Sequence, residues 1–159
     1  MSVESRADAR HAARLAAVQA LYQMEMSGSG ADEVAEEFIA HRFEELPVQP
    51  DADFFTTILQ GVPVHQVEID RAIAGALSEK WKLERVDSIL RAILRCGVFE
   101  LIARRDVPAK VVIDEYVAVA GAFFGADEPG FINAALDAIA RRKRASEFGL
   151  PTPEGELDF

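Results

Sequence analysis

The sequence predicts an all-α protein, organised as a single-domain helical bundle with two helical subdomains. Apolar residues recur at helical spacing along nearly the whole chain, and we find no stretch of useful length that alternates apolar and polar residues as a half-buried strand would. The chain has 159 residues, of which 50% are hydrophobic, so one domain can bury a sizeable core and global disorder is not expected. We expect the domain over residues 1–145, with subdomains at about 5–79 and 84–144, followed by a flexible acidic tail over residues 146–159.

Two helices are expected before residue 47. Residues 5–26 are rich in alanine, leucine, glutamine and methionine, which are good helix formers, and the Ser-Gly-Ser-Gly run at 27–30 ends this helix. Asp32 is placed to cap the second helix, whose last apolar residue is Leu46. The prolines that follow Leu46 then break the helical pattern.

Two more helices are expected before the seam between the subdomains. Asp51 is placed to cap the third helix. Pro63 either kinks this helix or starts the fourth, which continues to Leu77. The seam lies near residues 78–84 and contains Trp81, and it leaves two helical halves that are each too small to be an independent domain.

Three helices are expected in the second half of the chain. The first spans residues 86–102 and is apolar over a wide arc, which predicts a place at the centre of the bundle. The second spans residues 111–123, and Gly125 terminates it. The third begins near Glu128, and Pro129 is tolerable in its first turn.

Composition and spacing argue against several functional classes. No apolar run approaches the roughly 18 residues that a membrane span needs, and the N-terminus lacks the apolar stretch of a secretory signal, which favours a cytoplasmic location. Cys96 is the single cysteine, and it is interpreted as a buried core residue rather than a nucleophile. The histidines show no metal-ligand spacing, and the glycines at 28 and 30 do not form a phosphate-binding loop. We therefore expect a protein without catalytic activity, metal or cofactor.

Charge is distributed unevenly along the sequence. The net charge is −10, and residues 25–70 contain eleven acids against one base, Arg42. The other residues contain sixteen acids and sixteen bases, and these bases gather mainly at residues 6–14, 85–110 and 141–144. Such asymmetry is typical of a nucleic-acid-binding face, and ordinary solvated helices show it as well. The acidic segment either keeps nucleic acid away from its own side of the protein or attracts a basic partner, and the sequence leaves both open.

Arg6, Arg10 and Arg14 are spaced by four residues and form one stripe on the first predicted helix. The stripe continues to Leu21, which is expected to face the core, so the arginines lie in line with the core-facing side. Burying three arginines without partners is unfavourable. Two interpretations stay open. Either the first turns extend beyond the core and present the stripe to a phosphate backbone, or the arginines pair with acids of the chain itself.

Other candidate RNA-binding residues also have ordinary structural interpretations. The basic run at residues 141–144 either contacts phosphates or complements the helix dipole and extends into solvent. The aromatic side chains of Tyr22, Tyr116 and Phe131 either stack on unpaired bases or pack in the core.

Several stretches of the sequence form an ordered series. The first is RLAAVQALYQ at residues 14–23, and Gly61-Val62, His65 and Ile69-Asp70 follow it. The next is ILRCGVFEL at residues 93–101. The last is VPAKVVIDE at residues 107–115, which leads to Phe124-Gly125 and to FINAALD at residues 131–137. Together they resemble the NusB family of bacterial transcription antitermination factors, over about residues 6–143.

The resemblance implies a NusB-like fold of two stacked helical subdomains, in an RNA-binding protein without catalytic activity. NusB proteins pair with NusE, a ribosomal protein of the small subunit, and this heterodimer recognises the single-stranded boxA element of nascent ribosomal RNA. With other Nus factors it keeps RNA polymerase from terminating early. By matching position, the implied RNA-binding residues are Arg6, Arg10, Arg14, Tyr22, Arg95, Lys110, Phe131 and Asn133.

Departures from the family pattern thin the basic face. The turn between Arg10 and Arg14 lacks the denser arginine cluster of many NusB proteins. Asp114, Gly121 and Gly130 stand where the family commonly has an asparagine, a lysine and a basic residue. These changes predict weak RNA binding by the chain alone and a strong dependence on NusE. The alternative is a helical protein–protein interaction module with little RNA affinity, and the sequence leaves both a monomer and a homodimer open.

Overall fold

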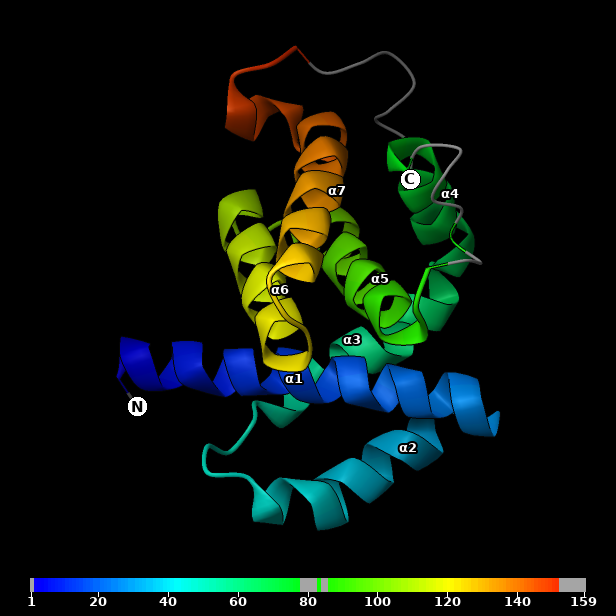
Figure 1. Ribbon diagram of the computed structural model, residues 1–159. Helices are drawn as coiled ribbons and strands as arrows, with labels where there is room; N and C mark the ends of the chain where they lie inside the picture. The colour runs from blue at the N-terminus through cyan, green and yellow to red at the C-terminus, as the bar shows by residue number, and fades with distance from the viewer. Residues whose placement is uncertain (1, 78–82, 84–85, 152–159) are drawn as a thin grey trace. The chain divides into compact units, whose positions relative to one another are not determined.

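The computed structural model describes residues 2–77, 83 and 86–151, and Figure 1 shows that they form helices with short connections. No strand occurs in these ranges, and the predicted all-α class is confirmed. The chain divides into two compact units, Met1–Val64 and His65–Phe159. The division lies before the predicted seam at residues 78–84, because the helix before His65 packs on the first helix whereas the helix after it packs on later ones. Trp81 lies outside the described residues.

The first unit is built, in its described residues, around one long helix. Its elements are α1 (Val3–Ser27), α2 (Ala31–Glu37), the π-helical η1 (Phe38–Arg42), the 3-10 helical η2 (Phe43–Glu45) and α3 (Ala52–Val64). α1 packs against α3 and α2, and α2 also packs against α3. The predicted second helix is therefore present, but its last two turns leave the regular α-helical geometry.

Local hydrogen bonds fix the ends of α1 and the start of α3. The Ser2 hydroxyl accepts a hydrogen bond from the Ser5 N–H at 3.1 Å, and Gly28 ends α1 with a φ of +74°, which glycine adopts without steric cost. At α3, Asp51 Oδ1 accepts a hydrogen bond from the Phe54 N–H at 3.0 Å. This bond confirms the predicted cap at Asp51.

The predicted cap at Asp32 is wrong. α2 begins at Ala31, with Gly30 at the cap position, so Asp32 lies inside the first turn. Its carboxylate there accepts a hydrogen bond from Gln60 Nε2 of α3 at 2.9 Å. An acid in the first turn still favours the helix because it faces the positive end of the helix dipole.

Three phenylalanine rings pack together in the core of the first unit. The ring of Phe55 stacks on that of Phe38 with 5.8 Å between centroids, and it meets Phe43 edge-on at 5.0 Å. All three side chains are buried. The rings therefore fasten η1 and η2 to α3 through apolar burial and aromatic geometry.

The second unit is built around α5. Its described elements are α4 (Gln66–Ala76), α5 (Ser88–Ala103), α6 (Ala109–Phe123), α7 (Asp127–Lys143) and the 3-10 helical η4 (Ala145–Phe148). α5 packs against α4, α6 and α7, and its residues from Ala92 to Ile102 are buried except Arg95. The predicted central place of this helix is confirmed, and so is the interpretation of Cys96 as a core residue.

The C-terminal part of the second unit differs from the predicted tail. Residues 145–148, most of which were assigned to the tail, form η4 directly after α7, and Ala145 is buried. No helix in the described part of the chain is both long and apolar enough to cross a bilayer.

Candidate nucleic-acid interface

The predicted RNA-binding residues fall in both units of the chain. α1 carries Arg6, Arg10, Arg14 and Tyr22, whereas Arg95 lies on α5, Lys110 on α6, and Phe131 and Asn133 on α7. Within the first unit the structure brings Arg10 and Arg14 to one aromatic ring. Within the second unit it brings Lys110 and Asn133 to one pocket.

Arg10 and Arg14 both contact the ring of Phe54. The Cζ atom of Arg10 lies 4.7 Å from the ring centroid, and that of Arg14 lies 4.8 Å from it. Phe54 stands in the first turn of α3 and is buried, at 3% exposure. The packing of α1 on α3 therefore sets two guanidinium groups against one ring, where the ring quadrupole attracts them.

Burial changes along the arginine stripe. Arg6 is exposed, Arg10 is half-buried, and Arg14 is buried at 2% exposure. The two interpretations of the stripe therefore apply at different positions. Its N-terminal part faces solvent as phosphate binding requires, whereas Arg14 is engaged inside the first unit, where its contacts include the ring of Phe54.

Tyr22 lies farther along α1 and is 36% exposed. The neighbouring Gln23 is engaged within the first unit, because its amide donates to Glu37 Oε2 at 3.1 Å and its Oε1 accepts from Arg42 at 3.2 Å. The ring of Tyr22 is thus open to solvent beside a set of internal hydrogen bonds. This exposure is compatible with base stacking.

Arg95 is held by an acid within the second unit. Its Nε and Nη2 atoms donate to the two carboxylate oxygens of Asp70 on α4, at 3.0 and 3.2 Å, and its side chain is only 15% exposed. A bidentate pair of this kind ties α4 to α5. A phosphate at Arg95 would have to compete with Asp70.

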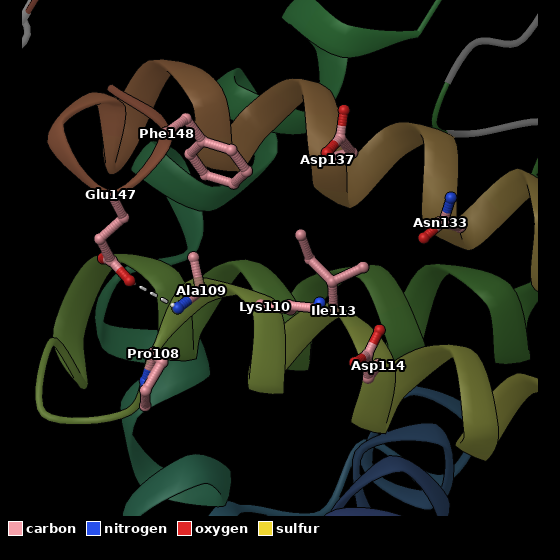
Figure 2. A pocket seen from close by; sticks show the side chains of 9 residues that line it. All are labelled: Pro108, Ala109, Lys110, Ile113, Asp114, Asn133, Asp137, Glu147 and Phe148. Atoms are coloured by element: carbon pink, nitrogen blue, oxygen red, sulfur yellow. Dashed lines mark hydrogen bonds between the residues drawn. The ribbon is translucent and has the colours of Figure 1, made fainter. Parts of the chain in front are cut away.

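A pocket of about 590 Å³ lies between α6 and α7 and is lined by both Lys110 and Asn133 (Figure 2). Phe148 of η4 closes one end, and the side chain of Ile113 points from α6 towards α7. The lining also contains three carboxylates, which belong to Asp114, Asp137 and Glu147.

Two of the three carboxylates in this pocket are paired. Asp137 accepts from Arg141 Nε at 2.9 Å, and Glu147 accepts from Arg144 Nη1 at 2.7 Å. The third carboxylate, that of Asp114, offsets the positive charge of Lys110, so the pocket lining has no excess of basic residues. The pocket offers the amide of Asn133, an apolar wall at Ile113 and the ring of Phe148 at one end. These groups suit the edge and face of a base better than a phosphate group.

The expected exposure of the whole basic run at residues 141–144 is wrong for its last residue. Arg144 is 2% exposed. Its Nε donates to the Leu101 carbonyl at 2.8 Å, and its Nη1 donates to the Val107 carbonyl at 2.9 Å. The Leu101 carbonyl lies in the last turn of α5, where carbonyls lack a partner within the helix, and Arg144 donates to it in place of water. It is therefore a structural residue and does not face an external phosphate.

The aromatic candidates also divide between the core and the surface. Tyr116 is buried and its hydroxyl donates to Glu100, so the core interpretation holds for it. Phe131 is half-buried at the start of α7. Phe54 and Phe148 were missed as site residues, because the sequence marks Phe54 only as an apolar helical position and Phe148 only as part of a tail.

The thiol of Cys96 is buried inside α5 of the second unit. Burial raises the pKa of the Cys96 thiol far above its usual range, and Glu100 raises it further. The thiolate that a nucleophile requires is thus disfavoured. In the part of the chain that the structure describes, no cluster of three or more histidine, cysteine, aspartate or glutamate side chains is arranged to hold a metal ion.

Comparison with known proteins identifies the family. The NusB family model matches residues 11–141. The transcription antitermination protein NusB of Maricaulis maris (strain MCS10) is 55% identical over 150 residues, which cover 91% of this chain and 94% of that protein. The fold is similar to that of T. maritima NusB, with a TM-score of 0.74 and 29% identity over 89% of this chain and 97% of that one.

A crystal structure of the antitermination factors NusB and NusE in complex with dsRNA also has this fold. Its matching chain gives a TM-score of 0.73 at 24% identity, covering 84% of this chain and 97% of that chain. Fold and sequence thus place the protein among the all-helical transcription antitermination factors. The chain belongs to the NusB family.

Proposed function

We propose that this chain is an RNA-binding transcription antitermination factor that acts together with NusE. The observation that carries the proposal is the 55% identity to a NusB antitermination protein over 91% of the chain. The NusB–NusE–dsRNA complex, whose NusB has the same fold, supports RNA and NusE as partners. The RNA is single-stranded boxA of nascent ribosomal transcripts, and other Nus factors and RNA polymerase are indirect partners. The protein works in the cytoplasm and carries out no catalysis.

The exposed predicted residues are the best candidates for RNA contact. Arg6 and Arg10 supply cations at the solvent-facing part of the arginine stripe, and Tyr22 offers an exposed ring. Lys110 and Asn133 offer polar groups at the pocket between α6 and α7. Phe131 is half-buried, which leaves part of its ring for packing on a base.

Two observations favour a reduced RNA affinity of the chain alone. Arg14 is buried, and Arg95 is paired with Asp70, so two predicted cations are engaged within the protein. Fewer phosphate contacts weaken binding and lower its dependence on salt. The same observations favour the second candidate function, a helical protein–protein interaction module with little RNA affinity.

Fluorescence anisotropy of labelled boxA RNA tests the proposal. The protein is titrated with and without NusE at two salt concentrations, and a scrambled RNA serves as the control. We expect NusE to sharpen binding to boxA over the scrambled RNA. If neither mixture prefers boxA while the two proteins still associate, the interaction-module function replaces the proposal. Equal binding with and without NusE contradicts the dependence on this partner.

A charge-reversal pair assigns the binding to the arginine stripe. The double variant R6E/R10E is expected to lose boxA binding and to keep NusE binding. The matched control is Arg71→Glu, which reverses the charge of an exposed arginine of α4 outside the predicted set.

Analytical ultracentrifugation of the same samples, with and without RNA, shows whether a homodimer competes with RNA binding.

A further inference from the structure

We propose that Phe54 is a positioning residue of the RNA interface, whose ring holds the guanidinium of Arg10 in place before RNA arrives. The proposal rests on the RNA-binding function proposed above. Phe54 is a buried apolar side chain, and it is not among the RNA-binding residues that the family resemblance implies. Arg14 then acts through the same ring, and Arg10 is the residue that reaches phosphate.

The backbone around Phe54 is tied to α1 at the level of Arg10. The Asp51 N–H donates to the Ala9 carbonyl of α1 at 3.0 Å, and Asp51 in turn caps α3 through the Phe54 N–H. One short segment thus joins the residue before Arg10 to the residue that carries the ring. The position of the ring against the arginines is set by these two hydrogen bonds as well as by side-chain packing.

Contact with the ring leaves the hydrogen-bonding groups of Arg10 available. A guanidinium meets an aromatic ring through its flat face, and its five N–H donors lie in the plane of the group. Arg10 is only half-buried, so its side chain is not closed off from solvent. Fixing the side chain in advance reduces the conformational entropy lost on binding, and it therefore strengthens binding without a new contact.

Burial distinguishes the two arginines on the ring. Arg14 is 2% exposed and Arg10 is half-buried, although their Cζ atoms are almost equally far from the centroid. A phosphate in solvent can approach Arg10 directly. Arg14 contributes by packing on the ring that Arg10 also uses.

The first unit offers a matched control for the ring contact. The Cζ atom of Arg42 lies 4.9 Å from the centroid of Phe38, which is as buried as Phe54. Arg42 is the only base of the acidic segment, and it also donates to Gln23. Loss of the Phe38 ring removes a comparable aromatic group and cation contact at a place with no proposed role in RNA binding.

A double-mutant cycle on boxA binding in the presence of NusE tests the proposal. We expect Phe54→Leu to weaken RNA binding about five-fold, the size of one moderately exposed cation–π contact. In an Arg10→Ala background the same substitution should have no further effect, because Arg10 is the residue that the ring positions. Phe38→Leu should leave RNA affinity unchanged. An equal loss from Phe54→Leu with and without Arg10 overturns the proposal and indicates a general structural role.

NMR of the arginine Nε–Hε groups gives a readout that needs no RNA. In the wild-type protein we expect a slowly rotating, protected Arg10 signal, and in Phe54→Leu a mobile one. An Arg10 signal that does not change on loss of the ring overturns the proposal, even if boxA binds. If boxA does not bind the wild-type pair at all, the proposed function fails, and the NMR result still decides whether the ring holds Arg10.

Arg10→Lys covers the case in which Phe54→Leu does not fold. This substitution of a half-buried residue keeps the charge but loses the planar group that rests on the ring. We expect it to weaken boxA binding about five-fold, because charge alone does not position the donor. Wild-type affinity in Arg10→Lys overturns the proposal, since the ring contact would then be dispensable.

Discussion

A single arginine, Arg144, joins three elements of the second unit. Besides the carbonyls of Leu101 and Val107, its guanidinium donates to the carbonyl of Arg104 at 3.0 Å and to Glu147 Oε2 at 2.7 Å. It therefore connects the end of α7 to the end of α5, to the turn before α6 and to η4. A buried cation with this many acceptors is paired and fully hydrogen-bonded, which makes its burial tolerable.

Arg144→Leu is expected to destabilise the protein by about 3 kcal/mol, because it removes the donor to the carbonyls of Leu101 and Val107 and the cation that pairs with Glu147. Urea unfolding followed by circular dichroism measures the change. Arg141→Ala is the control, since it removes an exposed pair with Asp137 and should cost only about 0.5 kcal/mol. Equal effects of the two substitutions would contradict the structural role of Arg144.

The ionisation of Glu147 makes the stability of the folded protein depend on pH. Partial burial by itself raises the pKa of Glu147, but the hydrogen bond from the Ala109 N–H and the guanidinium of Arg144, with Arg105 nearby, lower it more. The net pKa lies below the ordinary value of a glutamate. A depressed pKa in the folded state stabilises the protein above the unfolded-state pKa, and this stabilisation is lost as pH falls through the folded-state pKa.

Glu147→Gln is therefore expected to remove a stabilisation that depends on pH. The wild type should be the more stable protein above about pH 4.3, the ordinary pKa of glutamate, and the difference should shrink as the pH falls further. Urea midpoints of both proteins between pH 3 and pH 7 measure it. A difference that stays constant across this range would show that Glu147 is not the titrating group.

At the scale of the helix, glycine is used in two opposite ways. Gly97 of α5 lies where a Cβ atom would come within 3.0 Å of Leu136 Cδ1 and 3.4 Å of Tyr116 Cδ2. Both neighbours are buried, so a Cβ atom at this position would have to displace side chains that are themselves packed. Gly121 of α6 is exposed, and a Cβ atom there would meet nothing within 4 Å. The first glycine permits close packing of α5 on α6 and α7, and the second only lowers the helix propensity of α6.

Alanine at these two positions should change stability in opposite directions. We expect Gly121→Ala to stabilise the protein by about 0.5–1 kcal/mol through helix propensity. Gly97→Ala should destabilise it by about 1 kcal/mol, because overpacking outweighs the same gain in propensity. The melting temperatures of the two variants, compared with that of the wild type, measure both changes. Stabilisation by Gly97→Ala would mean that the contact of α5 with α7 is looser than the structure shows.

The helices themselves were the most predictable feature. Helix formers, the Gly28 stop and the Asp51 cap act locally, so periodicity and capping rules place α1, α3 and α5 within a few residues. The shift from α-helical to π and 3-10 geometry after Glu37 had no such signal. In this segment Phe38 and Phe43 pack against Phe55 of α3, and contacts between residues so far apart in the chain leave no local sequence pattern.

At the scale of the whole molecule, charge is the dominant property. The net charge is −10, and the first unit carries most of the acidic excess on exposed side chains that include Glu33, Glu36, Glu44 and Glu45. Repulsion among them opposes folding, whereas the attraction of the basic residues for phosphate favours RNA binding. Salt screens both effects.

Salt is therefore expected to act on stability and on RNA binding with opposite sign. Between 20 and about 200 mM salt, the urea midpoint should rise as repulsion is screened, while boxA affinity should fall by about 0.7 logarithmic units per tenfold salt for each phosphate contact. Parallel titrations of the free protein and of the NusE complex measure the two trends. A urea midpoint that falls with salt would show that favourable ion pairs such as Arg95–Asp70 dominate.

The candidate site was less predictable than the fold. The arginine stripe was found from its spacing, but the burial of Arg14, the pairing of Arg95 with Asp70 and the internal use of Arg144 depend on residues 25 to 43 positions away or on other helices. An arginine offers the same residue type whether it meets a ring, a carboxylate, a carbonyl or a phosphate. Only the packed structure distinguishes these partners.

The connection between η2 and α3 is fastened at both ends. The Gln49 side chain donates to the Phe43 carbonyl at 2.9 Å, and the Asp51 N–H donates to the Ala9 carbonyl at 3.0 Å. An inserted or deleted residue here would shift Asp51 out of register with α1 and move the ring of Phe54 away from Arg10. The connection after Gly28 has no comparable tie to α3 in the described hydrogen bonds. Among related proteins, we therefore expect insertions and deletions to be common at residues 28–30 and rare at residues 46–51.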